Sequence, residues 1–253
     1  MISDHRHQVI VNKLESQGSV SVSDLVKEFG VSEMTIRRDL VILENKGLLR
    51  RVHGGALSQR GRSYEPPYMI RSTENMDSKQ RIGQFAASLV NNGDSLTLDI
   101  GTTTLEIAKN LHSKNDLTII TPSLQIANEL VSHPGIRLIL SGGVLRPGEL
   151  SMVGHLAERI FDEFYVDKLF LGAGAFDVRT GASEFNIEDA LVKRAMVKTA
   201  KQVILVADSS KFNQVALTSI VDLKSIHTIV TDNELDPIIV SNLNEEGIEV
   251  FLT

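Results

Sequence analysis

The sequence predicts an α/β protein of two domains, a small N-terminal domain with a β hairpin and a larger C-terminal α/β domain. Three observations predict this. The 253-residue chain has the usual length of two domains. Residues 4–56 have the pattern of short helices followed by a hairpin, whereas β-rich runs alternate with amphipathic helices later in the chain. Between them lies a polar segment with Pro66-Pro67 and no periodicity. We therefore expect domains at 1–57 and 78–253, joined by a linker at 58–77.

Composition excludes several classes of protein. The chain has no cysteine, which excludes disulfides, thiolate metal sites and cysteine nucleophiles. The seven histidines are scattered and form no H-x-x-x-H pair, so we expect no metal and no other cofactor. No apolar run reaches the ~18 residues of a membrane span, and the N-terminus lacks the apolar core of a secretory signal. We expect a cytoplasmic protein.

The first domain begins with two predicted helices. The first extends from Asp4 to about Glu15 and ends at Gly18. A short β-like run, Ser19–Val22, follows it. Ser21 and Asp24 have the spacing of a capping box for a helix that continues through Phe29.

A turn at Gly30 leads to the most informative segment, residues 31–44. Ser32 caps this third helix, whose core residues lie at i, i+4 and i+7: Ile36, Leu40 and Leu43. Gly47 stands where a left-handed helix end is expected. Residues 48–56 then predict a β hairpin that turns at Gly54-Gly55.

A helix, a turn, a second helix and a basic hairpin are what a protein needs to place one helix in the major groove of DNA. Base edges in that groove show a distinct donor and acceptor pattern for each base pair. The candidate base-reading residues are Ser32, Thr35, Arg37 and Arg38, and the candidate phosphate or minor-groove contacts are Arg50, Arg51 and His53. The alternative is that Arg37 and Arg38 form only a solvated helix face.

The distribution of charge agrees with DNA binding although the net charge is −6. Residues 1–62 carry ten Lys and Arg against seven Asp and Glu, and residues 63–253 carry sixteen against twenty-five. Residues 45–63 hold five cations and no acid. Because salt screens charges beyond ~8 Å, a local basic patch attracts phosphate despite a distant acidic domain.

The first domain resembles a known family. Residues 31–40, VSEMTIRRDL, followed by residues 47–56, GLLRRVHGGA, are similar to the N-terminal signature of DeoR-type bacterial transcriptional regulators. The resemblance implies a winged helix-turn-helix followed by a domain that senses a sugar phosphate.

The second domain alternates strands with helices, which is typical of a mostly parallel sheet covered on both faces. The predicted strands are 95–100, 117–121, 137–140, 168–171, 202–207 and 225–231, and the predicted helices are 104–111, 123–131 and 187–200.

A turn rich in threonine, residues 101–104, links a strand to a helix. Hydroxyls beside the free N–H groups of a helix N-terminus suit an anion such as phosphate, although an ordinary capped turn has the same pattern. Three more polar segments follow strands: 121–123, 141–143 and 207–211. Ligands of open α/β sheets bind outside the carboxyl ends of the strands, where all four segments should lie.

These segments also resemble the sensor domain of DeoR-type regulators, and that domain is similar to the ribose-5-phosphate isomerase fold. The resemblance implies an effector site at Asp99, Gly101, Thr102, Thr103, Thr104, Ser123, Gly142, Gly143, Arg146 and Lys211. The resemblance leaves two roles open for Glu188 and Lys193: they line the pocket, or they belong to a subunit contact. Ser183-Glu184-Phe185 departs from the Thr-rich run typical of this loop, which leaves the effector's identity open.

We therefore expect a transcriptional repressor of carbohydrate use that binds operator DNA and a phosphorylated sugar, acts as a homo-oligomer (a dimer or tetramer), and has no catalytic residue. Two alternatives remain. Asp208 and Lys211 could move protons on a sugar, which would make the chain an isomerase-like enzyme with a DNA-binding appendage. A purely architectural DNA binder needs no ligand, but the large second domain disfavours that role.

Overall fold

The fold described here is that of a computed structural model, which describes residues 3–17, 19–57 and 61–253. Contacts divide the chain into two compact units, residues 1–61 and residues 62–253. Each unit has its own apolar core. The predicted terminator Gly18 and residues 58–60 of the predicted linker lie outside the described residues.

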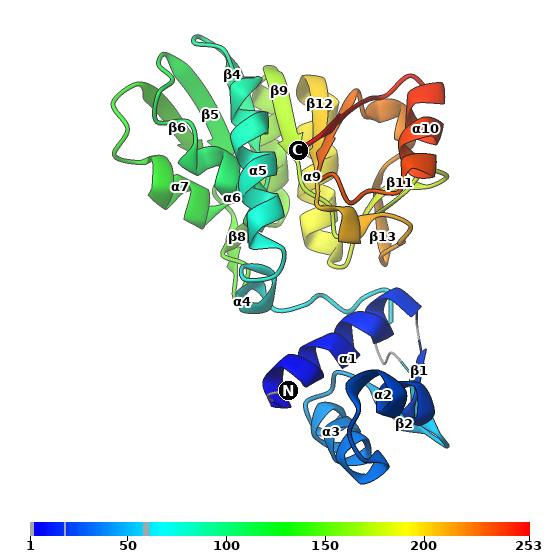
Figure 1. The fold of residues 1–253 in the computed structure, drawn as a ribbon. Coiled ribbons are helices and arrows are strands. Elements are labelled where there is room, and N and C mark those ends of the chain that lie inside the picture. Colours follow the sequence, from blue (N-terminus) through cyan, green and yellow to red (C-terminus); the bar gives the residue numbers. More distant parts are fainter. Residues whose placement is uncertain (1–2, 18, 58–60) are drawn as a thin grey trace. The chain divides into compact units, whose positions relative to one another are not determined.

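The first unit is a small helical body with a β wing (Figure 1). Its strands form an antiparallel sheet in the order β1-β3-β2. The elements are α1 (Ser3–Gln17), β1 (Ser19–Ser21), α2 (Val22–Phe29), α3 (Glu33–Asn45), β2 (Arg50–Val52) and β3 (Gly55–Leu57). This is the predicted order of helices and hairpin.

Short-range signals begin and end these helices as the sequence predicted. Ser21 caps α2 by accepting a hydrogen bond from the Asp24 amide at 3.0 Å. Gly30 ends α2 with φ 63°, a left-handed conformation that costs glycine little. Ser32 then caps α3 through the Thr35 amide at 3.2 Å. The turn between α2 and α3 is therefore set by residues within it.

The second unit is built on a seven-stranded sheet in the order β15-β14-β12-β9-β4-β5-β6, in which all neighbouring strands run parallel. Its strands are β4 (Ser95–Leu98), β5 (Leu117–Thr121), β6 (Ile136–Leu140), β9 (Val166–Leu171), β12 (Ala200–Val206), β14 (Thr228–Thr231) and β15 (Glu249–Leu252). The α/β fold with a parallel sheet is confirmed. The edge strand β15 was not predicted.

Helices cover both faces of this sheet (Figure 1). On β9, Phe170 packs in one core, whereas its neighbours Leu169 and Leu171 pack in the other, as the alternation of a strand requires. The core around Phe170 includes residues of α5, α6 and α7, and the opposite core includes residues of α8, α9 and α10. These helices are α5 (Met76–Ser88), α6 (Thr102–Lys109), α7 (Leu124–Leu130), α8 (His155–Arg159), α9 (Ile187–Thr199) and α10 (Pro237–Glu245).

Several smaller elements were not predicted from the sequence. An antiparallel sheet has the order β10-β11-β13, and β7 pairs with β8. They are β7 (Val144–Arg146), β8 (Ser151–Val153), β10 (Ala175–Asp177), β11 (Gly181–Glu184), β13 (Thr218–Val221), and the 3-10 turns η1 (Ile160–Glu163), η2 (Ser209–Lys211) and η3 (Leu223–Ser225).

The segment predicted as a linker is structured over much of its length. Contacts place residues 62–77 in the second unit, where they form α4 (Tyr68–Arg71) and begin α5 at Met76. Buried charge holds the segment, since the Arg71 guanidinium pairs with Glu149. The sequence analysis missed α4 because it is short and has no buried apolar residue. It also missed α5, although Ile82, Ala86 and Ala87 of that helix recur at helical spacing and are buried in the core.

Candidate functional site

The exposed face of α3 carries the residues predicted to read DNA. Arg37 and Arg38 are exposed, and Thr35 is half-buried. The Arg37 guanidinium donates to Glu33 Oε1, one turn earlier, at 2.6 Å. Arg38 has no such partner on α3 among the described contacts, so its guanidinium is available to a base edge or a phosphate.

A buried charge cluster fixes α3 against α1. Asp39 is 3% exposed, and its carboxylate accepts from Arg6 Nε at 2.6 Å and lies 2.9 Å from His7 Nε2. Burial by itself would raise the pKa of Asp39, but the hydrogen bonds from Arg6 and His7 outweigh it and lower that pKa. Since Asp39 follows Arg38 directly, the cluster orients the helix face that would enter the groove.

The wing presents its cations to solvent. Arg50, Arg51 and His53 are exposed on β2 and the adjoining turn. The Arg51 amide donates to Glu44 Oε1 at 2.9 Å, and the Arg51 guanidinium donates to Glu44 Oε2. Both hydrogen bonds lower the pKa of Glu44. The contact ties the base of the wing to the end of α3.

The second unit has a pocket where its strand order reverses. From β4 the chain continues to β5 and β6 on one side of the sheet, whereas β9 and β12 lie on the other. Ligands of open α/β sheets bind at such a switch point. The pocket is lined by the segments that follow three strands: 100–104 after β4, 172–174 after β9, and 207, 208 and 211 after β12.

The threonine-rich turn forms one end of this pocket. Gly101 takes φ 133°, a conformation that favours glycine, and starts α6 at Thr102. Within the described residues, no side chain caps the first N–H groups of α6. Thr102 and Thr103 line the pocket together with these groups. An anion that accepted their hydrogen bonds would also gain from the helix dipole.

Close packing of α5 on α6 holds this turn in place. A Cβ at Gly83 of α5 would lie 2.5 Å from the Glu106 Cβ of α6 and 2.7 Å from its backbone carbon. Only glycine permits this approach, which positions both the turn and Lys79 on α5.

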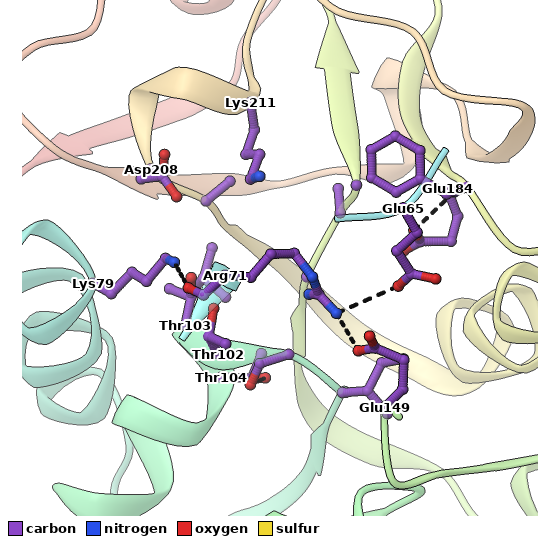
Figure 2. Close-up of a pocket in the computed structure, with 18 of the residues that line it drawn as sticks. Glu65, Arg71, Lys79, Thr102, Thr103, Thr104, Glu149, Glu184, Asp208 and Lys211 are labelled. Carbon is purple, nitrogen blue, oxygen red and sulfur yellow. Dashed lines mark hydrogen bonds and ion pairs between the residues drawn. The ribbon is translucent and has the colours of Figure 1, made fainter. Parts of the chain in front are cut away.

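Two lysines lie at the same end of the pocket (Figure 2). Lys79 is 3% exposed, and its ammonium donates to the carbonyl of Glu74 at 2.7 Å. Burial lowers the pKa of Lys79 to about 8, and the charge of Lys211 adds to the effect of burial. An anion bound between them would reverse that shift, so the lysines suit a phosphate better than a neutral group.

Acidic side chains and one arginine form the opposite wall. Figure 2 shows the Arg71 guanidinium pointing between Glu65 and Glu149, and it pairs with both. Burial by itself would lower the pKa of Arg71, but Glu149 and Glu65 outweigh it and raise that pKa. Burial of Glu65 raises the pKa of its carboxyl group, and the hydrogen bond from Arg146 offsets only part of this increase.

A buried charged triad forms the floor of the pocket. Lys193 of α9 is 2% exposed and donates to Asp99 Oδ2 at 2.7 Å and to Gly172 O at 3.0 Å; its ammonium also lies 3.0 Å from Glu184 Oε2. Burial by itself would lower the pKa of Lys193, but the charges of Asp99 and Glu184 outweigh it and raise that pKa. The triad joins the ends of β4, β9 and β11, so it fixes the pocket floor.

Comparison with known proteins gives the family. The model described as "DeoR-like helix-turn-helix domain" matches residues 6–61, and the model described as "DeoR C terminal sensor domain" matches residues 74–233. The chain belongs to the DeoR family. It is a DNA-binding transcriptional regulator with a sensor domain, so the predicted family is confirmed, and its relatives carry the names of regulators and repressors rather than of enzymes.

Relatives share nearly the full length of this DeoR-family chain. The HTH-type transcriptional regulator YulB of Bacillus subtilis is 38% identical over 99% of this chain and 96% of its own. The glycerol-3-phosphate regulon repressor of Escherichia coli is 34% identical over 92% of each.

Solved structures give weaker matches. The sorbitol operon regulator SorC of Klebsiella pneumoniae matches 96% of this chain and 99% of its own, at 11% identity and a TM-score of 0.44. The ribose-5-phosphate isomerase of Methanocaldococcus jannaschii matches 55% of each chain, at 18% identity and a TM-score of 0.41.

The pocket brings together half of the effector residues predicted for this DeoR-family chain. Gly101, Thr102, Thr103, Thr104 and Lys211 line it. The other five lie elsewhere: Asp99 is fully buried under the pocket, Ser123 caps α7, Gly142 and Gly143 form the turn before β7, and Arg146 pairs with Glu65 and Asp189. Of the two residues with open roles, Lys193 lines the pocket and Glu188 is exposed on α9.

Sequence reasoning missed the acidic wall and Lys79. Glu65 and Arg71 stand in the supposed linker, and Glu149 stands in a polar loop, so neither apolar periodicity nor a strand end marked them. The available signal was the pair of prolines before Tyr68, which favours a fixed path over a flexible one.

In the described part of the chain, no helix is long and apolar enough to cross a membrane.

Proposed function

We propose that this regulator represses a set of genes for carbohydrate use and that a phosphorylated sugar, bound in the pocket of the second unit, alters its hold on operator DNA. The observation that carries the proposal is the uncapped N-terminus of α6, with its threonines and two lysines, at the switch point of the sheet. The name of the glycerol-3-phosphate regulon repressor, a relative over nearly the full length, supports a small phosphorylated ligand.

In the proposed complex, the phosphate accepts hydrogen bonds from the 102–104 amides while Lys79 and Lys211 neutralise its charge. Asp208 then orients the sugar. Its Oδ1 accepts from Asn75 Nδ2 at 2.9 Å, but its Oδ2 is buried without a hydrogen-bond partner among the described residues. Burial by itself would raise the pKa of Asp208, but Lys211 and Ser210 outweigh it and lower that pKa. A buried carboxylate oxygen without a donor favours a ligand hydroxyl at that position.

Thr103→Glu tests the phosphate position. A carboxylate in the first turn of α6 is compatible with the helix dipole but repels a phosphate, so we expect the fold to remain. Sugar phosphates should no longer raise the melting temperature or change operator affinity. Thr180→Glu, in an exposed turn, is the matched control and should respond as the wild type does. A retained response in Thr103→Glu would place the phosphate elsewhere.

For DNA, we propose that Ser32, Thr35, Arg37 and Arg38 approach base edges and that Arg50, Arg51 and His53 contact the backbone or an adjacent minor groove. The face of α3 supports this, because its cations are exposed while Ile36 and Leu40 are buried on the other side. A single wing and helix reach few base pairs. We therefore propose a homo-oligomer, a dimer or tetramer, that binds repeated half-sites in the cytoplasm.

The proposed roles of Arg38 and Arg51 predict different losses of DNA binding. Arg38→Ala should weaken binding to a duplex selected as the operator by ~1–3 kcal/mol and relax its base preference. Arg51→Ala should weaken operator and random duplex alike and reduce the salt slope by about 1. Fluorescence anisotropy on both duplexes, over a series of salt concentrations, separates the two outcomes. An unchanged base preference in Arg38→Ala would refute its role as a reader.

A further inference from the structure

Residues 62–75, which we call the strap, lie along the pocket of the second unit. In the chain the strap follows directly after residues 6–61, the part that matches the helix-turn-helix family. Its side chains Glu65 and Arg71 line the pocket, and only 14% and 15% of their side-chain surfaces are exposed. A connecting segment thus forms part of the ligand-binding wall.

Side-chain bonds fasten the strap at three points to the rest of the second unit. All three use charged or amide groups in or next to the pocket, so a ligand would compete for the same groups. The pairs are Glu65 with Arg146, Arg71 with Glu149, and Asn75 Nδ2 with Asp208 Oδ1 at 2.9 Å.

Lys79 provides the closest connection between the strap and the proposed phosphate position. Its ammonium donates to two strap carbonyls, those of Arg71 and Glu74. Lys79 also lines the pocket with Thr102 and Thr103, and Figure 2 shows its side chain extending toward them. An ammonium has three donors and bonds more strongly to an anion than to a neutral carbonyl. A phosphate on the turn would therefore draw Lys79 away from the strap.

The small size of the pocket favours movement of one wall when a ligand binds. The enclosed cavity has a volume of only about 50 Å³, so displacement of a wall would give a phosphorylated sugar more room. The floor is fixed by the buried Lys193 triad and by strand ends in the core. At its Glu65 end the strap is held by the ion pair of Glu65 with Arg146, while the charges of Glu149 and Glu184 repel the Glu65 carboxylate.

We propose that the strap transmits effector binding: an anion on the 101–104 turn takes over Lys79, and the strap is released from the pocket wall. The segment that leads to the DNA-binding unit then changes its state with pocket occupancy. This inference rests on the proposed function, namely that the turn binds a phosphate.

Hydrogen exchange on the full chain tests the proposal, with inorganic phosphate as the probe and chloride at equal ionic strength as the control. The strap amides of Ser72, Thr73 and Glu74 donate to Tyr68 and Ile70 carbonyls, so their exchange reports on strap order. Phosphate should slow exchange at amides 102–105 and accelerate it at amides 72–74. Amides 239–246, at α10 away from the pocket lining, should not change.

Two lysine variants distinguish release of the strap from the loss of a positive charge in the pocket. Lys79→Met removes both carbonyl bonds, so strap amides should exchange roughly tenfold faster without phosphate and respond no further to it. Lys211→Met removes a pocket cation that has no bond to the strap among the described residues. It should weaken phosphate binding and leave strap exchange at the wild-type rate. Unchanged exchange at 239–246 verifies that each variant is folded.

The outcomes distinguish this inference from the function on which it rests. Slower exchange at 102–105 with no change at 72–74 would overturn the strap inference and leave the phosphate site standing. No change at either segment would overturn the phosphate site, and the strap inference with it. Strap exchange in Lys79→Met equal to that of the wild type would also overturn the inference.

Discussion

Replacing Asp39 with Ala is expected to destabilise the N-terminal unit by ~3–5 kcal/mol, because it leaves the buried Arg6 guanidinium without its carboxylate. A unit of this size has only about 3–9 kcal/mol in total. The variant should therefore lose much of its folded helix-turn-helix, and with it operator binding. The second unit has a separate core and should remain folded.

Calorimetry of the full chain measures this effect as a shift of one of two unfolding transitions. The matched control is Glu33→Ala, which removes another carboxylate from α3. Glu33 pairs with Arg37 at 2.6 Å, but both side chains are more than half exposed, so its loss should cost at most about 0.5 kcal/mol. Equal effects of the two substitutions would show that the burial of the Asp39 cluster has no energetic role.

Acid should weaken the same unit through the same residue. A carboxylate with a lowered folded-state pKa stabilises the fold above its unfolded-state pKa, here 3.8, and loses that contribution as pH falls through the lower folded-state value. The wild-type N-terminal unit should therefore lose stability below about pH 4, and Asp39→Asn should lack this part of the pH dependence.

The helix-turn-helix could be predicted in detail because its decisive signals are local. Ser21, Gly30 and Ser32 act on backbone groups within four residues of themselves, so their effect is readable from spacing alone. The parallel sheet was predictable for a related reason. Its strands are short apolar runs bounded by turn residues, and its threonine-rich turn directly follows one of them.

The pocket wall could not be predicted because it depends on contacts between distant parts of the chain. Glu65 and Arg146 are 81 residues apart, and Asn75 and Asp208 are 133 apart. Asp99 shows the same limit for a residue that was predicted to contact the effector and does not line the pocket. The family resemblance implied a ligand contact for Asp99, but Lys193, 94 residues later, instead holds it beneath the pocket. Sequence spacing identifies a strand end but not which of its side chains face the ligand.

Lys193→Met should be the most damaging single substitution in the second unit. It leaves the buried carboxylates of Asp99 and Glu184 without their ammonium, and loss of one partner from a buried ion pair costs ~3–5 kcal/mol. Methionine has nearly the length of lysine, so packing is largely retained and the loss is one of charge. We expect a lower melting temperature for the second unit and a disordered pocket floor.

Two further variants determine whether charge is the cause. Lys198→Met removes an exposed lysine from the same helix and should change stability by no more than about 0.5 kcal/mol. Adding Asp99→Asn and Glu184→Gln to Lys193→Met removes the unpaired carboxylates and should recover part of the lost stability, measured by thermal denaturation. If the triple variant is no more stable than Lys193→Met alone, the unpaired carboxylates are not the cause of the loss. The pocket floor would then depend on the hydrogen bond from the Lys193 ammonium to the Gly172 carbonyl and not on the ion pairs.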